Sequence, residues 1–325
     1  MDTDVLIEAL ADGWGIDVDA ADYAAVGAGS YHWVVSDRNG TRAFVTVDDL
    51  DLKAWLGDTR ESTFDGLRRA FDTAAALRDA DLGFVVAPIP TSSGETLRRL
   101  GTRHTIAVFP FVDGQAGEYG PTVERAVVVT MLAELHNATP AVGSVAGSVG
   151  LELPGRRHIE AGLEELGQTW SGGPFSEPAR QALAGHASDV AELLALADRL
   201  AADVAGRAGK WVITHGEPHA ANVMRTGESH LLVDWDTVAL SVPERDLWWV
   251  VSETGEEASI YAAATGHELD QVAVDFFRLT WDLKDLVACL EVLRSPHRHT
   301  EDTVKEYEIL TTCIAIRDQW AALLE

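Results

Sequence analysis

The segment at residues 214–223 has the clearest capacity for chemistry. It reads Thr-His-Gly-Glu-Pro-His-Ala-Ala-Asn-Val, and its glycine and proline indicate a loop instead of a regular helix. An apolar run follows and ends at Asp234. Phosphoryl transfer needs an acid that deprotonates a hydroxyl, together with an amide and a second acid that offer hard oxygen ligands to Mg²⁺. Glu217, Asn222 and Asp234 have the residue types that this chemistry requires.

The two histidines of the segment also suggest a zinc-protease site, but their surroundings do not fit one. His215 and His219 are four residues apart, with Glu217 between them. A zinc-protease helix has both histidines on one face and the glutamate directly after the first. Gly216 and Pro218 interrupt any such helix. We therefore favour phosphoryl transfer.

In order and spacing, these residues resemble the aminoglycoside phosphotransferase family, whose antibiotic kinases are related to choline kinases and, more distantly, to protein kinases. The family pattern His-Gly-Asp-x-x-x-x-Asn is matched by residues 215–222, with a glutamate in place of the aspartate. Ile-Asp-Trp is matched by residues 233–235, and Pro-x-x-Asp-Leu by residues 243–247. The resemblance implies that Asn222 and Asp234 are the Mg²⁺ ligands.

The resemblance further implies a site for ATP, or for GTP in its place, in the first third of the chain. Residues 26–31 (Val-Gly-Ala-Gly-Ser-Tyr) fall where the family has the turn that covers the phosphates. Residues 108–112 fall at the hinge, whose backbone groups would meet the adenine. The implied nucleotide-binding residues are Gly27, Gly29, Ser30, Thr46, Phe109 and Phe111.

Two departures from the family concern the catalytic acid and a lysine. Glu217, the implied catalytic base, is one methylene longer than aspartate and has nearly the same reference acidity. The family's strand lysine, which binds the α- and β-phosphates, belongs near Thr46, where there is none. Arg42, on the same strand face by alternation, or Lys53, seven residues on in a loop, could supply the charge. Mg²⁺ with the Thr46 hydroxyl is a third solution.

The elements that must position these residues change in character along the chain. The first hundred residues contain alternating apolar runs, an Asn-Gly hairpin signal and a helical pattern over 63–79. Helical patterns dominate later, over 122–137, 176–206, 269–293 and 302–324. We expect an α+β fold, bilobal and protein-kinase-like. Its expected parts are a β-rich nucleotide-binding lobe (1–108), a hinge (109–117) and a helical lobe with the catalytic loop and acceptor site (118–325).

Composition limits the partners. The 325 residues include 25 Lys and Arg against 52 Asp and Glu, a net charge of −27. Such a charge disfavours nucleic acids and anionic membranes and attracts cations, although solubility explains it equally well. No apolar run approaches the ~20 residues of a membrane span, and the N-terminus lacks signal-peptide features. Cys289 and Cys313 cannot staple a fold of this size. We expect a cytoplasmic protein, of unspecified oligomeric state.

The expected acceptor is a small cationic molecule: an aminoglycoside, an aminocyclitol or a basic peptide antibiotic, with the protein acting as a resistance kinase. In the family, acidic side chains of the helical lobe meet the ammonium groups of the substrate. The candidates here are Asp236, Glu253, Asp282 and Asp285, with Trp281 as a cation–π surface. Alternatively, Asp282 and Asp285 belong to a solvated acidic helix face, and Trp281 lies in the core.

Two other functions stay open. The same motifs suit a housekeeping kinase for a sugar, an amino alcohol or a homoserine-like metabolite. The missing strand lysine and the glutamate at the catalytic position suit a nucleotide-binding pseudokinase that senses without transfer. Against the pseudokinase, both implied Mg²⁺ ligands, Asn222 and Asp234, are present. We therefore favour an enzyme.

Overall fold

The computed structural model describes residues 3–26, 30–53, 55–120, 123–207, 209–227 and 229–324. The chain forms two compact units, each built from two segments. The first unit comprises Met1–Val149 and Lys210–Leu269, and the second Gly150–Gly209 and Asp270–Glu325. The two units are defined by the contacts within each of them. The lobe boundaries expected around residues 109–117 stay a prediction.

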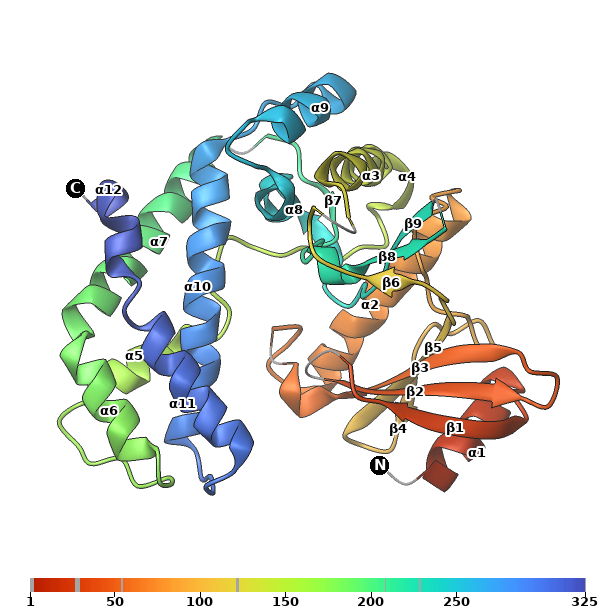
Figure 1. Cartoon of the computed structure of the whole chain (residues 1–325), viewed down its shortest axis with the longest axis horizontal. Helices are drawn as coiled ribbons and strands as arrows, with labels where there is room; N and C mark the ends of the chain where they lie inside the picture. The colour runs from red at the N-terminus through yellow and green to blue at the C-terminus, as the bar shows by residue number, and fades with distance from the viewer. Residues whose placement is uncertain are drawn as a thin grey trace. The chain divides into compact units, whose positions relative to one another are not determined.

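The first unit begins with a five-stranded antiparallel sheet of order β1-β2-β3-β5-β4 (Figure 1). Its strands are β1 (Val18–Ala24), β2 (Ser30–Asp37), β3 (Arg42–Asp49), β4 (Arg98–Leu100) and β5 (His104–Pro110). The register places Thr46 of β3 opposite His32 of β2 and Ala107 of β5. Because side chains alternate along a strand, Phe44, Thr46 and Asp48 share one face of β3, which we call the Thr46 face.

Two helices cover opposite faces of this sheet. Leu6 and Leu10 of α1 (Thr3–Trp14) pack with Val45 of β3. Leu67 and Phe71 of α2 (Arg60–Asp79) pack on the other face, with Ala107 and Phe109 of β5. The helix predicted over 63–79 is thus confirmed and begins three residues earlier, at Arg60. A 3-10 helix, η1 (Leu50–Leu52), connects β3 towards α2.

The rest of the first unit carries the candidate catalytic segment, residues 214–223. The hydrogen-bonded strands are β6 (Gln115–Ala116), β8 (Val223–Thr226) and β9 (Ser229–Leu232) in one sheet, and β7 (Val212–Thr214) with β10 (Ala239–Ser241) in another. The helices are α3 (Arg125–Asn137), α4 (Thr139–Val142), η2 (Ala220–Asn222), α8 (Glu244–Val250) and α9 (Glu256–Thr265). They enclose an apolar core that includes Leu132, Leu232, Trp235 and Leu247. Trp235 is completely buried, which anchors the chain directly after Asp234.

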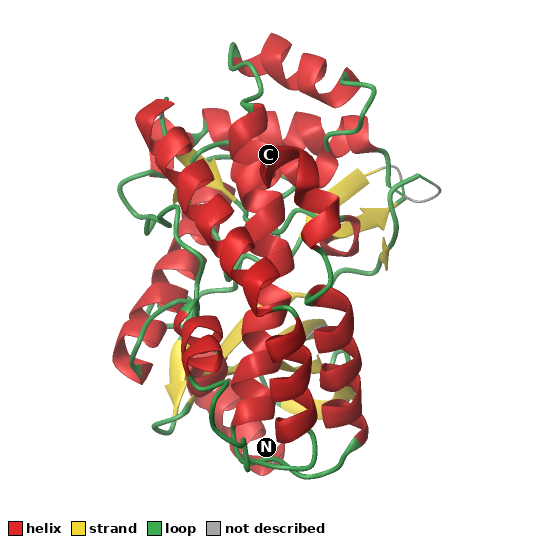
Figure 2. Cartoon of the chain, turned by 90° about the vertical axis from the view of Figure 1, so that its left-hand side faces the viewer, coloured by secondary structure: helices red, strands yellow, loops and turns green. Residues whose placement is uncertain are grey.

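The regular elements described in the second unit are helices joined by loops. Figure 2 shows helices in red and loops in green. The helices of the second unit are α5 (Arg157–Glu164), α6 (Ser176–Gly185), α7 (Ala187–Arg207), α10 (Gln271–Arg294), α11 (Glu301–Cys313), η3 (Arg317–Trp320) and α12 (Ala321–Leu324). The long helix α10 packs against α5, α6, α7 and α11. None of the helices described in this chain is long and apolar enough to cross a membrane. An antiparallel sheet followed by a mainly helical region agrees with the expected fold class.

Candidate functional site

The catalytic segment is a loop that follows β7 and leads through η2 into β8. Gly216 has a φ of 100°, a conformation that L side chains rarely adopt, so glycine is required at this bend. A Cβ there would also overlap the Arg245 guanidinium. That guanidinium donates to the Thr214 hydroxyl at 2.7 Å and to the Thr237 carbonyl at 2.9 Å. The strand end and the loop are thereby held together.

His215 is buried and connects the loop to the strand that precedes Asp234. Its Nδ1 accepts the Glu217 backbone N–H at 3.3 Å, so the remaining proton belongs on Nε2. Nε2 then donates to the Val233 carbonyl at 2.9 Å. Burial lowers the pKa of His215, which favours this neutral form. The histidine therefore positions the backbone on both sides of the site without carrying a charge.

Asp246, the aspartate of the predicted Pro-x-x-Asp-Leu match, is completely buried and holds the loop backbone. Its carboxylate accepts the N–H groups of His215 (2.8 Å) and Gly216 (2.6 Å). His136 lies 3.1 Å from the same carboxylate and 2.6 Å from the Tyr261 hydroxyl. Burial alone would raise the pKa of Asp246, but the His136 hydrogen bond and neighbouring positive charges outweigh it and lower the pKa. His136 is thus part of the loop's support.

Glu217 and Asn222 are presented by the same loop. Glu217 is half-buried, and its backbone carbonyl accepts the Asn222 side-chain amide at 2.9 Å. The Val233 N–H in turn donates to the Asn222 carbonyl at 3.0 Å. Since the Asn222 nitrogen is engaged by the loop, its side-chain oxygen is the atom left for a cation. The hydrogen bonds bring the segments that carry Glu217, Asn222 and Asp234 next to each other.

Asp234 has an unusual backbone conformation, which it shares among the described non-glycine residues with Asp81. Its φ of 66° lies in the left-handed region, which is strained for a residue other than glycine. The residue as a whole is exposed, but desolvation of its carboxyl group by the surrounding protein, followed by the charge of Asp236, raises its pKa well above the usual value. A bound cation would relieve this cost because it favours the charged carboxylate.

The donor set fits Mg²⁺ only in combination with a nucleotide. Among the described residues, no three His, Cys, Asp or Glu side chains are grouped closely enough to hold a metal ion. Mg²⁺ is commonly bound by one or two carboxylates together with substrate phosphates, so a complete protein cage is unnecessary. Asn222 and Asp234 provide one amide oxygen and one carboxylate for such a shared site.

A buried lysine lies beside these acids. Lys53, just after η1, places its Nζ 2.5 Å from Asp236 Oδ2 and 3.2 Å from Asp48 Oδ1, and its side chain is 3% exposed. Burial would lower the pKa of Lys53, but the attraction of Asp236 and Asp48 outweighs it and raises the pKa. Asp236, which the sequence suggests as an acceptor contact, is thus paired with Lys53 within the protein. Sequence patterns did not reveal this cluster.

The other expected nucleotide contacts are only partly described. Gly27 and Gly29 lie outside the described residues. Ser30 donates to Asp48 Oδ1 at 2.6 Å, and the buried Thr46 has its hydroxyl 3.2 Å from His32 Nδ1. His32 was not expected in the site, although it lies opposite Thr46 in the register.

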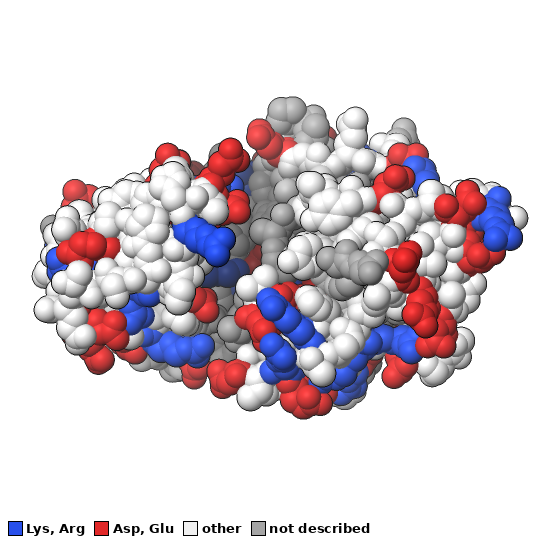
Figure 3. Space-filling view, turned by 90° about the horizontal axis from the view of Figure 1, so that it is seen from below, with Lys and Arg blue, Asp and Glu red and all other residues white. Residues whose placement is uncertain are grey.

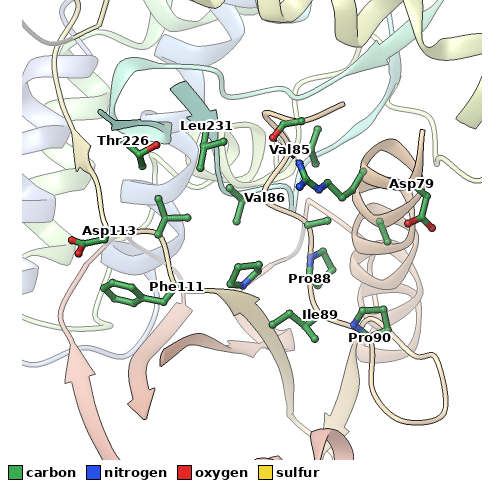
Figure 4. A pocket seen from close by; sticks show the side chains of 16 residues that line it. Asp79, Val85, Val86, Pro88, Ile89, Pro90, Phe111, Asp113, Thr226 and Leu231 are labelled. Atoms are coloured by element: carbon green, nitrogen blue, oxygen red, sulfur yellow. Dashed lines mark hydrogen bonds between the residues drawn. The ribbon is translucent and has the colours of Figure 1, made fainter. Parts of the chain in front are cut away.

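Near the expected hinge, the aromatic side chains have separate roles. Phe109 packs edge-to-face on Phe71 of α2 at 5.4 Å between ring centroids. Phe111 lies beneath the Arg42 guanidinium, 3.9 Å from the ring centroid, and Arg42 also pairs with Asp113. A pocket of about 600 Å³ lies beside the hinge, between Phe111 and Ile89 on one side and Leu231 and Thr226 on the other (Figure 4). Phe111 is the one expected site residue in its lining.

The remaining acceptor candidates belong to different units. Glu253 is exposed in the first unit, after α8. Trp281, Asp282 and Asp285 lie on α10 of the second unit, and Asp282 accepts the Trp320 indole N–H at 3.2 Å. Burial raises the pKa of Asp282 and of Asp285. Trp281 is half-buried rather than part of the core.

Comparisons with known proteins identify the family of this chain. The model of the phosphotransferase enzyme family matches residues 23–283. Protein StrN of Streptomyces griseus is 23% identical over 250 residues, covering 74% of this chain and 75% of that protein.

Solved structures share the fold. The crystal structure of a spectinomycin phosphotransferase in complex with ADP and spectinomycin has a TM-score of 0.71 at 16% identity, covering 97% of this chain and 98% of that one. A microcompartment-associated aminopropanol kinase has a TM-score of 0.60 at 15% identity, covering 99% and 98%. The expected kinase-like fold is confirmed.

Proposed function

Because this chain belongs to the phosphotransferase enzyme family, we propose that it transfers the terminal phosphoryl group of ATP to a hydroxyl group of a small cationic molecule. The observation that carries the proposal is one hydrogen-bonded loop. It presents Glu217 and Asn222 and is bonded to Val233, the neighbour of Asp234. These are the residue types that phosphoryl transfer requires.

Glu217 is the base in this mechanism. It accepts the proton of the acceptor hydroxyl as the new bond from that oxygen to phosphorus forms. The bond from phosphorus to the bridging oxygen of ADP breaks, and its electron pair leaves with ADP. His215 and Asp246 fix the loop backbone, so the base needs little reorganisation during the reaction.

Asn222 and Asp234 would hold Mg²⁺ with the nucleotide phosphates. When bound, the ion would supply positive charge to the phosphate oxygens. Asp234 contributes its carboxylate, and Asn222 contributes its side-chain oxygen. GTP is the alternative donor.

The proposed acceptor carries ammonium groups, and an aminocyclitol or another cationic antibiotic is the first choice. The net charge of −27 favours a cation. Glu253, in the same unit as Glu217, is the candidate contact there. Asp282 and Asp285 stay separate candidates on α10 of the second unit, where burial disfavours their charged forms and an ammonium group beside them would restore those forms. The fold shared with a spectinomycin phosphotransferase supports this class.

A kinase for an amino alcohol or another housekeeping metabolite is the second candidate. The fold shared with an aminopropanol kinase favours it. The charge distribution also leaves room for a less cationic acceptor, because acidic and basic side chains are interspersed on the face shown in Figure 3. The acidic balance is therefore not concentrated on that face.

The deciding experiment incubates the purified chain with ATP and Mg²⁺ against a panel of cationic antibiotics and a panel of metabolites. ADP release and the added phosphoryl mass are measured for each. We expect transfer to an antibiotic or aminocyclitol. Transfer confined to the metabolites would support the second candidate, and ATP binding without transfer on both panels would support a sensor.

The role of the base is tested with the acceptor so identified. Glu217→Gln should lower kcat by about 10²–10⁴-fold with little change in ATP affinity. The kcat of Glu217→Asp should lie between that of the wild type and that of Glu217→Gln, because misplacement of the base by ~1 Å lowers the rate on the order of 100-fold. Glu134→Gln, which alters an exposed glutamate of α3, is the matched control. Full activity of Glu217→Gln would show that another group takes the proton.

A further inference from the structure

The Thr46 face of β3 lacks a cation where the nucleotide phosphates are expected. Thr46 itself bonds to His32, and burial lowers the pKa of His32, which favours the neutral imidazole. Arg42 begins the same face, but its guanidinium is half-exposed and is engaged at the hinge by Asp113 and the Phe111 ring. Neither side chain brings a positive charge to Thr46.

The segment that follows β3 brings a lysine back to this face. Asp49 caps η1 by accepting the Asp51 N–H at 3.0 Å, and it is anchored by Arg103 at 2.9 Å. The chain therefore turns tightly, and Lys53 returns to Asp48, on the Thr46 face, and to Asp236. The contact joins positions 183 residues apart.

We infer that Lys53 is the cation that binds the nucleotide phosphates, in place of the strand lysine missing at Thr46. The inference rests on the proposed function. An ammonium group has three N–H donors, and two of them have partners in Asp48 and Asp236. The centroid of the Trp55 ring also lies 5.3 Å from this ammonium. In the inferred complex the third donor binds a phosphate oxygen beside Asp234, the proposed Mg²⁺ ligand, whose charge also acts on Lys53.

The carboxyl groups around Lys53 call for a further cation, so a phosphate would reach this lysine together with Mg²⁺. Three carboxyl groups, those of Asp48, Asp234 and Asp236, surround one ammonium. Asp48 is 1% exposed, and its Oδ2 has no hydrogen-bond partner. Buried polar atoms are nearly always paired, so this site is incomplete without a further positively charged or donating group. Mg²⁺ bound with the nucleotide would complete it.

A purely structural tether is the competing explanation, since Lys53 also holds the segment after β3 to Asp236. The two roles predict different binding of two probes. A phosphate-binding lysine affects ATP and leaves adenosine unaffected, because adenosine has no phosphate. A tether that shapes the site affects both probes equally.

The experiment measures binding of ATP with Mg²⁺, and of adenosine, by calorimetry on the full chain and on Lys53→Met. We expect about 10–100-fold weaker ATP binding, as for the loss of a charge-assisted hydrogen bond, with adenosine affinity within about twofold. Lys305→Met removes an exposed lysine of α11 and should change neither affinity. Unchanged ATP binding, or equal weakening for ATP and adenosine, would overturn the inference.

A second variant covers the case in which Lys53→Met does not fold. Lys53→Met with Asp48→Asn removes both charges of one buried pair, so no carboxylate at position 48 is left uncompensated. For this double variant we again expect weaker ATP binding with unchanged adenosine binding. Equal weakening for ATP and adenosine would contradict the inference. If the wild-type chain binds neither ATP nor GTP, the proposed function itself fails, which is a different result.

Discussion

Replacement of Asp246 tests whether the hydrogen bonds that its carboxylate accepts from backbone N–H groups hold the loop after β7 in place. The carboxylate accepts two loop N–H groups, those of His215 and Gly216, and contacts His136. Asp246→Asn preserves the shape but turns an NH₂ group towards at least one of these donors. The variant loses one charge-assisted hydrogen bond, worth about 1.5–3 kcal/mol, and leaves a buried N–H unsatisfied at about 1–3 kcal/mol. We expect a loss of roughly 3–5 kcal/mol, as for breaking a buried ion pair.

Two measurements check this value. Hydrogen exchange at the amides of His215 and Gly216 reports the loop directly, and urea unfolding followed by tryptophan fluorescence reports stability. Asp318→Asn, which removes an almost fully exposed carboxylate, is the control for a lost negative charge. We expect faster exchange at both loop amides and a kcat about 100-fold lower, because the base is displaced by ~1 Å.

The pH dependence provides a second check on Asp246. Its pKa is lowered in the folded protein, so its stabilisation is present above the unfolded pKa of about 3.9 and is lost as the pH falls through the folded pKa. The difference in free energy of unfolding between wild type and Asp246→Asn should stay constant from about pH 7 to pH 5 and shrink below about pH 4. A loss under ~1 kcal/mol at pH 7, with both amides still protected, would refute the reasoning.

Two further substitutions test the metal ligand and the bend of the loop. Asp234→Asn should reduce kcat by at least about 100-fold while the fold and its unfolding curve are retained, since positioning and charge neutralisation carry this chemistry; a kcat close to that of wild type would exclude Asp234 as a ligand. Gly216→Ala should destabilise the chain by about 1–3 kcal/mol, because its φ is unfavourable for alanine and its Cβ meets Arg245; an unchanged urea midpoint would contradict this.

Local signals in the sequence predict much of the fold. The Asn-Gly hairpin after Asp37 forms as expected, with Gly40 at a φ of 80°. The long helices α2 and α10 follow their apolar spacing. By contrast, the helix expected over 176–206 is divided at His186 into α6 and α7. Gly185, a poor helix former, directly precedes the break, so the sequence contained a local signal for it that the apolar spacing alone does not show.

Elements with weak patterns were missed. Strand β1 reads Val-Asp-Ala-Ala-Asp-Tyr-Ala, and none of its residues is fully buried. It forms because it pairs with β2, an interaction that composition does not reveal. The same applies to Cys289 and Cys313, which lie on α10 and α11. Their contact, together with burial, raises the pKa of the Cys289 thiol, and the sequence showed only two distant cysteines.

The candidate site also contains residues that the sequence predicts and a contact that it does not. Glu217 and Asn222 lie on one short loop, so their spacing along the chain is sufficient to predict that they act together. The contact of Lys53 with Asp236 joins loops from different parts of the first unit, and neither loop has a periodicity that would indicate a partner. Alternation along β3 does place Asp48 on the Thr46 face, which is the one sequence signal that could have indicated this cluster.

The backbone of Asp234 gives an independent reason to regard it as functional. A residue other than glycine in the left-handed region costs on the order of 1–3 kcal/mol and persists only where its surroundings enforce it. Here Val233 on one side bonds to Asn222 and His215, and Trp235 on the other is buried, with its indole N–H donating to the Leu232 carbonyl at 2.8 Å. A glycine would relieve the strain but would remove the carboxylate. The strain is tolerated at the position where the motif requires an acid, so conformation and sequence point to the same residue.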